Sequence, residues 1–455
     1  MESPSSAESV ARAARAAFDS ASQSLSTSPS ADATRSSALL SIRTALESNK
    51  SRIQQANALD MEAATLLVSQ GKLSSSLASR LDLFSKAGKW ESLLAGVSDV
   101  AALPSPLDHV QWAKRLADAT ETQASIDLFR VTCPIGVLLC IFEARPEVVV
   151  NIASLAIKSG NAAILKGGKE SKHTASILSK IISDALASSG LPKDLIQTVE
   201  TREDIQSLLH LDDYIDLVIP RGSNELVKAI QREARMPVMG HADGLCIGYV
   251  HKDADLAMTI GTVVDAKTDY PAACNALETL LVNSELLHRQ DFWPPLAEAL
   301  LKAGIELQED YQTEFLDLIL AVGCVGDVDG AISHISRYSS GHTEMILSSS
   351  QSGNHVVEKF VKSVDSANVF VNVSTRFADG FRFGLGTEVG ISTGKTHARG
   401  PVGLDGLVIY KYIAKSSHDP LPPQQLKSGP QIVADFNTGA RSWSHKNLLP
   451  KYPQL

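Results

Sequence analysis

Cys274 is the residue of this chain whose type and position best suit a nucleophile. It lies between Asp265 and Val282, on a turn that joins a helix-like run to an apolar run typical of a buried strand. A thiolate at such a turn can attack an activated acyl group and hold it as a thioester, while neighbouring backbone N–H groups stabilise the oxyanion that forms. The alternative is a structural cysteine, because free cysteine is among the most buried residue types.

Two strand-to-helix turns have residue types that suit a bound phosphate. In the stretch Lys166–Lys169, two glycines let the backbone approach a ligand and two lysines add positive charge. In the stretch Arg221–Ser223, a glycine again opens a predicted helix beside a basic residue. Neither stretch has the Gly-x-Gly-x-x-Gly or P-loop pattern, so an ordinary capped helix start is the alternative for each.

Three loops carry polar groups that suit a small anionic substrate. The groups are Arg145, Ser374, Arg376, His397 and Arg399. Arginine can hold a carboxylate or a phosphate through two hydrogen bonds. Single arginine and histidine residues are more often surface charges or hydrogen-bond partners within loops, so that interpretation stays open for each of them.

The composition is typical of an ordinary globular protein. Of 455 residues, 44% are apolar, and a net charge of −9 gives no general attraction to nucleic acid. No apolar run approaches the ~20 residues of a membrane span, and the first residues lack a signal-peptide pattern. The five cysteines form no Cys-x-x-Cys pair and no zinc-site spacing. We therefore expect a cytoplasmic protein without a metal, a membrane or a nucleic-acid partner.

Short apolar runs that alternate with helical patterns begin near Ile126. This alternation predicts βαβ units and a parallel sheet, and hence an α/β fold. A second alternating block begins near Leu245 and contains Cys274, which indicates a second α/β domain. Residues 1–120 are predicted to be mostly helical, and residues 416–455, rich in Pro, Ser, Gln and Gly, are predicted to be an extended or disordered tail.

Six motifs, in order along the chain, resemble those of the gamma-glutamyl phosphate reductases, also called glutamate-5-semialdehyde dehydrogenases, within the aldehyde dehydrogenase superfamily. The motifs are Phe142-Glu-Ala-Arg-Pro146, Ile164-Leu-Lys-Gly-Gly-Lys-Glu170, Ile219-Pro-Arg-Gly-Ser223, Pro271-Ala-Ala-Cys-Asn275, Ser340-Gly-His-Thr-Glu344 and His397-Ala-Arg-Gly-Pro-Val-Gly403. The similarity covers residues 10–415, and Val325–Ile346 resembles the signature region of that family. The ordered set makes the resemblance specific.

The resemblance implies an aldehyde dehydrogenase-like fold with two doubly wound α/β domains and a β-hairpin oligomerisation arm. The NADP(H)-binding domain would comprise residues 1–123 and 137–244, and the domain of the catalytic cysteine residues 245–405. Residues 124–136 and 406–415 would form the arm. Because an isolated two-stranded ribbon is marginal in water, the arm is expected to pair with another subunit in a homo-oligomer.

By position, the resemblance also implies roles for individual residues. Cys274 matches the catalytic cysteine, Lys166 the lysine that meets the adenosine ribose, and Glu314 the glutamate that contacts the nicotinamide ribose. A cation at Lys169, where NAD-preferring relatives often have a carboxylate, favours NADP(H). The expected cofactor-binding residues are Lys166, Gly168, Lys169, Arg221, Gly222, Ser223 and Glu314. The expected substrate-binding residues are Arg145, Lys267, Ser374, Arg376, His397 and Arg399.

The reaction implied is the NADPH-dependent reduction of L-glutamyl 5-phosphate to L-glutamate 5-semialdehyde through a Cys274 thioester, the second step of proline biosynthesis from glutamate. The segment Gly240–Ala242 has no carboxylate where ordinary aldehyde dehydrogenases place a water-activating glutamate. A reductase that expels phosphate needs no attacking water. The asparagine that forms the oxyanion hole in this fold is not evident near Ala144, so backbone N–H donors around Cys274 are expected, with the second donor open.

Two other functions stay open at this point. A non-phosphorylating semialdehyde dehydrogenase would hydrolyse its thioester, and the missing glutamate counts against it. A catalytically silent scaffold would keep the fold for binding alone, and the presence of Cys274 with both glycine turns counts against that. Contact with the glutamate 5-kinase that makes the labile substrate is a further expectation, although the sequence shows no docking motif.

Overall fold

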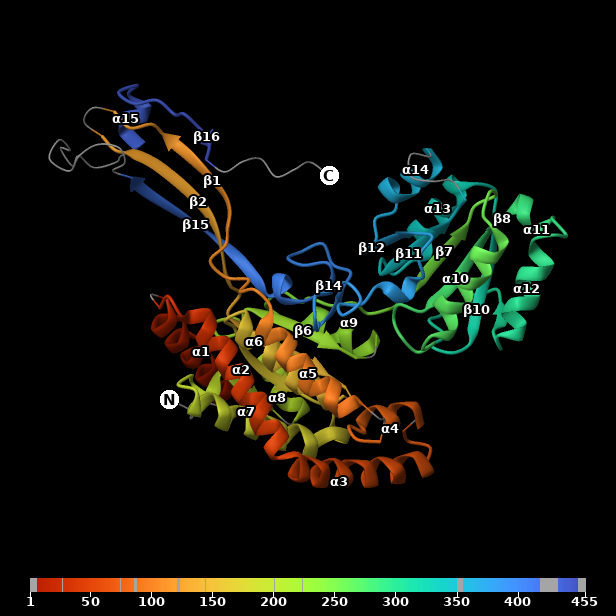
Figure 1. The fold of residues 1–455 in the computed structure, drawn as a ribbon, viewed down its shortest axis with the longest axis horizontal. Coiled ribbons are helices and arrows are strands. Elements are labelled where there is room, and N and C mark those ends of the chain that lie inside the picture. The colour runs from red at the N-terminus through yellow and green to blue at the C-terminus, as the bar shows by residue number, and fades with distance from the viewer. Residues whose placement is uncertain are drawn as a thin grey trace. The chain divides into compact units, whose positions relative to one another are not determined.

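The structure is a computed structural model, in which the chain forms two compact units (Figure 1). The larger comprises Met1–Leu103 and Gly136–Gly406, and the smaller Pro104–Ile135 and Leu407–Leu455. The residues described are 6–26, 28–73, 75–85, 88–120, 123–143, 145–199, 201–222, 224–349, 355–417 and 433–448. Within these ranges, no helix combines the length and the apolar character needed to cross a membrane.

A four-stranded parallel sheet forms the centre of the first α/β part, in the order β5-β4-β3-β6. Its strands are β3 (Val137–Phe142), β4 (Ala162–Lys166), β5 (Ile196–Thr198) and β6 (Leu217–Arg221). Every residue of β3 and β4 is buried, which is typical of a parallel sheet with helices on both faces. Both strands belong to the apolar runs from which the sequence predicts a parallel sheet.

The direction of the crossovers decides which helices cover each face of this sheet. The helices that connect its strands are α6 (Glu147–Lys158), α7 (Lys172–Ser188) and α8 (Arg202–Leu208), and α9 (Asn224–Glu233) follows β6. From β3 the chain passes through α6 to the neighbouring strand β4, and through α7 to β5 at the edge of the sheet. It then crosses back through α8 to β6, which lies on the other side of β3. Because such crossovers are right-handed, α6 and α7 share one face and α8 lies on the other.

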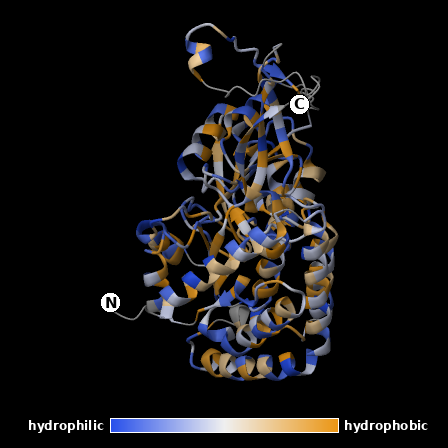
Figure 2. Cartoon of the chain, turned by 90° about the vertical axis from the view of Figure 1, so that its left-hand side faces the viewer, coloured by the Kyte–Doolittle hydropathy of each residue, from blue (hydrophilic) through white to orange (hydrophobic). Residues whose placement is uncertain are grey.

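The N-terminal helices add a further layer. They are α1 (Ser6–Leu25), α2 (Ala31–Ser48), α3 (Lys50–Ser69), α4 (Ser75–Leu81) and α5 (Lys89–Ala102). α1 packs against α8 and the sheet, whereas α2 packs against α6 and α7, α3 against α7, and α5 against α6. In Figure 2 these helices carry both apolar and polar colours, as expected for helices with one buried side.

A six-stranded parallel sheet forms the centre of the second α/β part, in the order β12-β11-β7-β8-β10-β9. Its strands are β7 (Cys246–Val250), β8 (Leu277–Asn283), β9 (Glu306–Gln308), β10 (Ile319–Val325), β11 (Thr343–Leu347) and β12 (Asn368–Val371). Its helices are α10 (Leu256–Thr268), α11 (Ser284–Leu287), α12 (Trp293–Lys302), α13 (Val328–Tyr338) and α14 (His355–Ser363). The strand order reverses here as well, so both predicted doubly wound α/β arrangements are confirmed.

Two hydrophobic clusters hold this sheet between its helices. Leu280 of β8 belongs to the cluster with Val263 of α10 and Leu296 of α12. The next residue, Leu281, belongs to the other cluster, with Phe360 of α14. Successive residues of a strand point to opposite faces, so one strand serves both clusters. The fold therefore fixes β8, and with it the turn that precedes β8, from both sides.

Short elements complete the larger unit. They are η1 (Lys169–Ser171), η2 (Lys193–Leu195), η3 (Thr375–Phe377), β13 (Gly390–Ser392), β14 (Gly400–Val402) and η4 (Leu404–Leu407). β13 and β14 pair antiparallel. Together with η3 they belong to the loops in which the sequence placed several substrate-binding candidates.

The smaller unit is an antiparallel sheet in the order β15-β2-β1-β16. Its strands are β1 (Val110–Ala117), β2 (Ser125–Pro134), β15 (Val408–Ser417) and β16 (Lys446–Asn447). β15 pairs with β2 along its whole length, from Val408 opposite Pro134 to Ser417 opposite Ser125. β2 and most of β15 fall in the segments 124–136 and 406–415 that the sequence assigns to the arm, and the sheet also includes β1.

Residues 433–448 differ from the extended tail that the sequence predicts for 416–455. They form α15 (Val433–Asn437) and β16, and β16 pairs with β1. The rings of Phe436 and Trp443 stack with centroids 3.9 Å apart, and the Arg441 guanidinium donates hydrogen bonds to the carbonyl oxygens of Ala124 (2.5 Å) and Asp118 (3.0 Å). These few anchors hold a segment that lacks any periodic pattern. The rest of that predicted tail beyond Ser417 lies outside the described residues.

Asp60 on α3 joins the first turn of α7 to the helical layer. Its buried carboxylate accepts hydrogen bonds from the backbone N–H groups of His173 (3.1 Å) and Thr174 (2.8 Å) and from the Thr174 hydroxyl (2.6 Å). N–H groups in the first turn of a helix lack partners within the helix, and a negative charge there also interacts favourably with the helix dipole. Asp60 therefore fixes the start of α7 against α3.

We expect Asp60→Ala to lower the free energy of unfolding by about 1–3 kcal/mol, because buried N–H donors of α7 lose their acceptor. Thermal unfolding followed by circular dichroism would show this as a lower midpoint. Asp184→Ala is the matched control on α7, since Asp184 makes only an exposed ion pair of 3.0 Å with Lys180, a contact that contributes little. Equal losses in the two variants would contradict this account of Asp60.

Candidate active site

The amino ends of three neighbouring strands bring Cys274 and two histidines together. Cys274 precedes β8, His241 precedes β7, and His342 directly precedes β11. These strands are adjacent and parallel, in the order β11-β7-β8, so their amino ends meet at the same edge of the sheet. The Cys274 sulfur and one ring nitrogen of each histidine lie within 4.8 Å of one another. The two imidazole rings meet edge to face, with centroids 5.0 Å apart.

The turn that carries Cys274 lies between α10 and β8, as the sequence predicts. The Ala276 N–H donates a hydrogen bond to the Ala273 carbonyl oxygen (2.9 Å), which closes a turn with Cys274 and Asn275 at its centre. Within the described part of the chain, the backbone N–H groups of Cys274 and Asn275 have no acceptor. The central N–H groups of such a turn are therefore available to an oxyanion.

The charges around Cys274 favour its thiolate. Burial opposes ionisation of the thiol, but the charge and hydrogen bond of His342, together with the charge of Arg221, outweigh burial and lower the pKa of Cys274. Glu388 acts in the opposite sense and more weakly. A lower pKa gives a larger thiolate fraction at neutral pH, and the thiolate is the nucleophilic form.

In both histidines, Nδ1 has a hydrogen-bond partner other than the Cys274 sulfur. His241 Nδ1 lies 2.8 Å from the carbonyl oxygen of Ile391, which only accepts, so Nδ1 carries the proton. Burial is the main cause that lowers the pKa of His241 and keeps the ring neutral. His342 Nδ1 lies 2.8 Å from the Thr343 hydroxyl, and apart from the Cys274 sulfur its Nε2 has no partner among the described residues.

Arg221 lies near the nucleophile. It ends β6 and is close enough for its charge to act on Cys274. Burial, and then the like charge of Arg145, lower the pKa of Arg221. Arg221, predicted to bind the cofactor, is therefore within electrostatic reach of both Cys274 and Arg145, which is predicted to bind the substrate.

Gly222 allows the chain to turn directly after Arg221. A Cβ atom there would lie 2.7 Å from Oε2 of Glu143 and 2.8 Å from Cδ2 of Leu226. Real Cβ atoms essentially never come this close, so a larger residue would require the ends of the Glu143 and Leu226 side chains to move. Ser223, the other residue predicted in this turn, lies outside the described residues.

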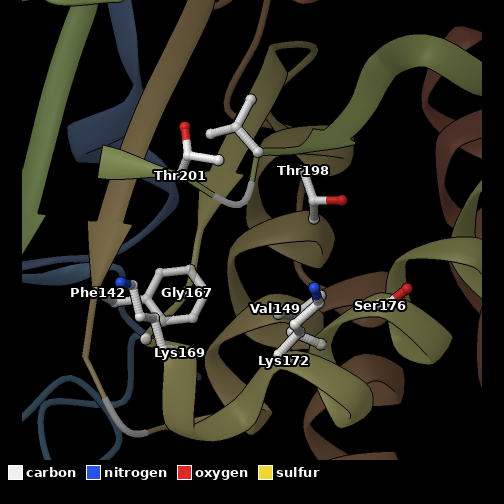
Figure 3. A pocket seen from close by; sticks show the side chains of 11 residues that line it. Phe142, Val149, Gly167, Lys169, Lys172, Ser176, Thr198 and Thr201 are labelled. Atoms are coloured by element: carbon white, nitrogen blue, oxygen red, sulfur yellow. The ribbon is translucent and has the colours of Figure 1, made fainter. Parts of the chain in front are cut away.

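A cavity of about 380 Å³ lies where β4 and β5 end, beside the first turn of α7 (Figure 3). Its lining combines apolar, hydroxyl and basic side chains with the bare backbone of two glycines. The lining residues are Phe142, Val149, Gly167, Gly168, Lys169, Lys172, Ala175, Ser176, Thr198, Val199 and Thr201. Nucleotide cofactors bind outside the carboxyl ends of parallel strands in folds of this class, and the lining fits an adenosine group with phosphate.

Two other residues predicted to bind the cofactor, Lys166 and Glu314, lie in different parts of the larger unit. Lys166 is buried at the end of β4, directly before the glycines that line the cavity. The Glu314 carboxylate accepts a hydrogen bond from the Gly244 N–H (3.0 Å), and burial raises the pKa of Glu314. A Cβ atom on Gly244 would lie 2.2 Å from the carbonyl oxygen of Cys274, so Gly244 touches the turn of the nucleophile. Gly244 therefore links Glu314 to that turn.

Arg376 and Ser374 brace the turn of Cys274. The Arg376 guanidinium donates a hydrogen bond to the Asn275 side-chain oxygen, and the Asn275 side-chain amide donates to the Ala378 carbonyl oxygen (2.9 Å). The Ser374 hydroxyl accepts from the Arg376 N–H at 3.4 Å and so begins η3. Both candidates therefore lie next to the nucleophile, in positions with internal partners.

Lys267 is not placed to bind a substrate. Its ammonium group is fully buried and forms an ion pair of 3.0 Å with Glu278, which is also buried. A buried charge requires such a partner, and the sequence does not indicate which lysine of a helix will point inward. We therefore no longer include Lys267 among the substrate-binding residues.

His397 and Arg399 lie together on the loop before β14. The Arg399 guanidinium pairs with Asp365 at 2.8 Å, and Nε2 of His397 lies 2.9 Å from the carbonyl oxygen of Gly406. His397 also has a φ of 73°, which few residues other than glycine adopt. These contacts stabilise the loop and give neither residue a contact with Cys274.

The sequence did not indicate His342 or His241 as parts of the site. His342 belonged to a recognised motif without a role, and His241 was considered only as the place of a missing carboxylate. The sequence does contain one signal for the site, because Cys274, His241 and His342 each come shortly before an apolar run. This signal identifies a site only when the order of the strands in the sheet is known.

Comparisons with known proteins agree with this fold. A model of the aldehyde dehydrogenase family matches residues 2–315. A probable gamma-glutamyl phosphate reductase of Schizosaccharomyces pombe is 46% identical over 437 residues, which covers 90% of this chain and 92% of the relative. The gamma-glutamyl phosphate reductase of Saccharomyces cerevisiae is 42% identical and covers 91% of this chain and 93% of the relative.

Solved structures show the same relationship. The gamma-glutamyl phosphate reductase of Thermotoga maritima has a TM-score of 0.82 at 32% identity, covering 91% of this chain and 99% of its own. A glyceraldehyde-3-phosphate dehydrogenase of Methanocaldococcus jannaschii complexed with NADP has a TM-score of 0.62 at 14% identity, covering 92% and 96%, and shows the fold alone. The family uses NAD(P). This chain belongs to the gamma-glutamyl phosphate reductases of the aldehyde dehydrogenase family.

Proposed function

We propose that this chain reduces L-glutamyl 5-phosphate to L-glutamate 5-semialdehyde and phosphate with NADPH, as a step of proline biosynthesis. The observation that carries the proposal is the environment of Cys274, a thiol whose pKa is lowered by His342 and Arg221 in spite of its burial. The absence of a carboxylate in Gly240–Ala242 supports release of phosphate rather than attack by water. The relatives named gamma-glutamyl phosphate reductase support the same substrate.

The chemistry balances without a protein base. The Cys274 thiolate attacks the γ-carbonyl carbon, a C–S bond forms and the C–O bond to phosphate breaks with its electron pair. The departing phosphate takes up one proton from water, and a thioester remains on Cys274. NADPH would supply a hydride to the thioester carbonyl. The thiohemiacetal then collapses, which releases the aldehyde and restores the thiolate.

Two kinds of group support binding of the leaving group and the oxyanion. Arg145 and Arg221 would hold the dianionic phosphate, because a guanidinium group forms charged hydrogen bonds with phosphate. The N–H groups of Cys274 and Asn275, which have no acceptor among the described residues, would stabilise the oxyanion of the tetrahedral intermediate. The Asn275 N–H is thus a candidate for the second oxyanion donor.

The cavity beside α7 supports NADP(H) as the cofactor. Its described lining includes Lys169 and Lys172 and no carboxylate. Two lysines suit a 2′-phosphate, whereas a carboxylate would suit the 2′-hydroxyl of NAD. Lys166 would meet the adenosine ribose, and Glu314 the nicotinamide ribose.

The smaller unit supports assembly into a homo-oligomer. β15 is an edge strand of the described sheet and exposes Ile409, Tyr410 and Tyr412. An exposed apolar edge strand is a template for pairing with another chain. Cytoplasmic localisation, and contact with the glutamate 5-kinase that makes the labile substrate, complete the proposal.

Replacing the nucleophile tests the reaction. We expect Cys274→Ser to abolish the phosphate-dependent reduction of NADP⁺ by glutamate semialdehyde, because a serine hydroxyl beside the same groups is almost entirely un-ionised at neutral pH. The initial rate of NADPH formation, with and without phosphate, measures this. Cys324→Ser, at an exposed cysteine, is the control and should retain activity.

The same assay separates the alternatives. Turnover of the wild type that needs no phosphate would establish the non-phosphorylating dehydrogenase. No turnover of a folded wild type that binds NADPH would establish the silent scaffold.

Removing a lysine of the cavity tests the cofactor preference. We expect Lys169→Ala to lower the ratio of kcat/KM for NADPH to that for NADH roughly 10–100-fold, the effect of losing one charged hydrogen bond of about 1.5–3 kcal/mol. Steady-state kinetics with both cofactors measure the ratio. Lys193→Ala, at an exposed lysine outside the cavity, should leave the ratio unchanged. A Lys169→Ala ratio equal to that of wild type would remove Lys169 from the 2′-phosphate site.

The pH dependence of thiol alkylation tests the role of His342. Only the thiolate reacts, so the rate rises with pH through the pKa of Cys274 and levels off above it. Because His342 lowers that pKa, His342→Gln should move the midpoint to higher pH and leave the plateau at high pH similar. Iodoacetamide labelling of Cys274, followed by mass spectrometry in buffer with a chelator, measures the profile. An unchanged midpoint would refute the role, and His288→Gln, at an exposed histidine, is the control.

A further inference from the structure

We propose that Cys274, His241 and His342 form a binding site for Zn²⁺, which reversibly blocks the nucleophile. One thiolate and two imidazole groups are a ligand set that zinc prefers, and three protein ligands leave a fourth position for water. Cys274 lies 33 residues after His241 and 68 residues before His342, so no short spacing motif in the sequence indicates the site. It exists only because β11, β7 and β8 are neighbours in the sheet.

The distances suit a site that closes around the ion. The three ligand atoms lie within 4.8 Å of one another. Zinc bonds of about 2.0–2.3 Å in a tetrahedral arrangement place ligand atoms about 3.5 Å apart. Movements of about an ångström, within the reach of side-chain rotation, therefore complete the first three bonds.

The hydrogen bonds of the two imidazole groups already orient them as metal ligands. Nδ1 of His241 donates to the Ile391 carbonyl oxygen, and Nδ1 of His342 is paired with the Thr343 hydroxyl. A histidine ligand usually has its second nitrogen fixed in this way, which aims the other nitrogen at the metal. His342 is fully buried, and its Nε2 has no hydrogen-bond partner in the described ranges. This buried ring nitrogen without a partner is the second observation that points to a ligand.

The ion can reach the site from solvent. Cys274 and His241 are partly exposed, while His342 closes the inner side. The S–H proton of Cys274 passes to solvent as the S–Zn bond forms, and nothing is oxidised or reduced. A sulfur bonded to zinc no longer attacks a carbonyl, so occupancy and turnover exclude each other. Binding of the ion does not depend on the proposed substrate.

Direct titration of the full chain with Zn²⁺ tests the site. Competition with a chromophoric chelator should give one Zn²⁺ per chain with release of protons, and Co²⁺ in its place should show a sulfur-to-metal charge-transfer band. Cys274→Ser, His241→Gln and His342→Gln should each weaken binding by more than about 100-fold, since even a change outside the ligand shell costs 10–100-fold. Cys324→Ser and His288→Gln should bind as wild type does.

A second measurement needs no variant. Zn²⁺ should protect Cys274 of the wild type from iodoacetamide, as read by mass spectrometry, and a chelator should restore labelling. Absence of stoichiometric binding, binding unaffected by Cys274→Ser, or labelling unaffected by bound Zn²⁺ would each overturn the proposal. A chain that binds Zn²⁺ in this way but shows no turnover would contradict the proposed function and leave the metal site established.

Discussion

The contact of Gly244 with the backbone of Cys274 is the constraint on which the site depends. A Cβ atom on Gly244 would lie 2.2 Å from the Cys274 carbonyl oxygen, so the segment before β7 and the turn before β8 touch through their main chains. The Gly244 N–H is thereby turned to Glu314, whose carboxylate it meets at 3.0 Å. One residue without a side chain thus links the nucleophile turn to the residue matched to the nicotinamide ribose, and any larger residue would separate them.

A buried ion pair holds the two ends of the same turn. Lys267 closes α10 and Glu278 belongs to β8, so their pair of 3.0 Å spans the loop that carries Cys274. Glu278 also accepts a hydrogen bond from the Phe315 N–H (3.3 Å), next to Glu314. Burial raises the pKa of Glu278 to about 7 and lowers that of Lys267. Such a pair adds little net stability, but removal of one partner leaves an uncompensated buried charge, so it defines the geometry of the loop.

The local sequence pattern was sufficient to predict the strands and the turn of Cys274, because hydrophobic periodicity and apolar runs reflect burial directly. It was insufficient for His241 and His342, whose approach to Cys274 depends on the order β11-β7-β8, a property of the crossovers and not of any short segment. It gave no sign that Lys267 points inward, because the buried partner Glu278 lies on another element. It also failed for residues 433–448, where one arginine and two stacked rings replace periodicity.

The pKa of Cys274 affects the attack by the sulfur and its later departure in opposite ways. A lower pKa raises the fraction of thiolate and makes the sulfur a better leaving group, but it makes each thiolate a weaker nucleophile. Burial raises the pKa of Cys274, but His342 and Arg221 together outweigh it and lower that pKa. The nearby carboxylates of Glu314 and Glu388 accept backbone N–H groups from Gly244 and Gly380. The segment Gly240–Ala242 contains no carboxylate, and a reaction that expels phosphate needs no group that activates water.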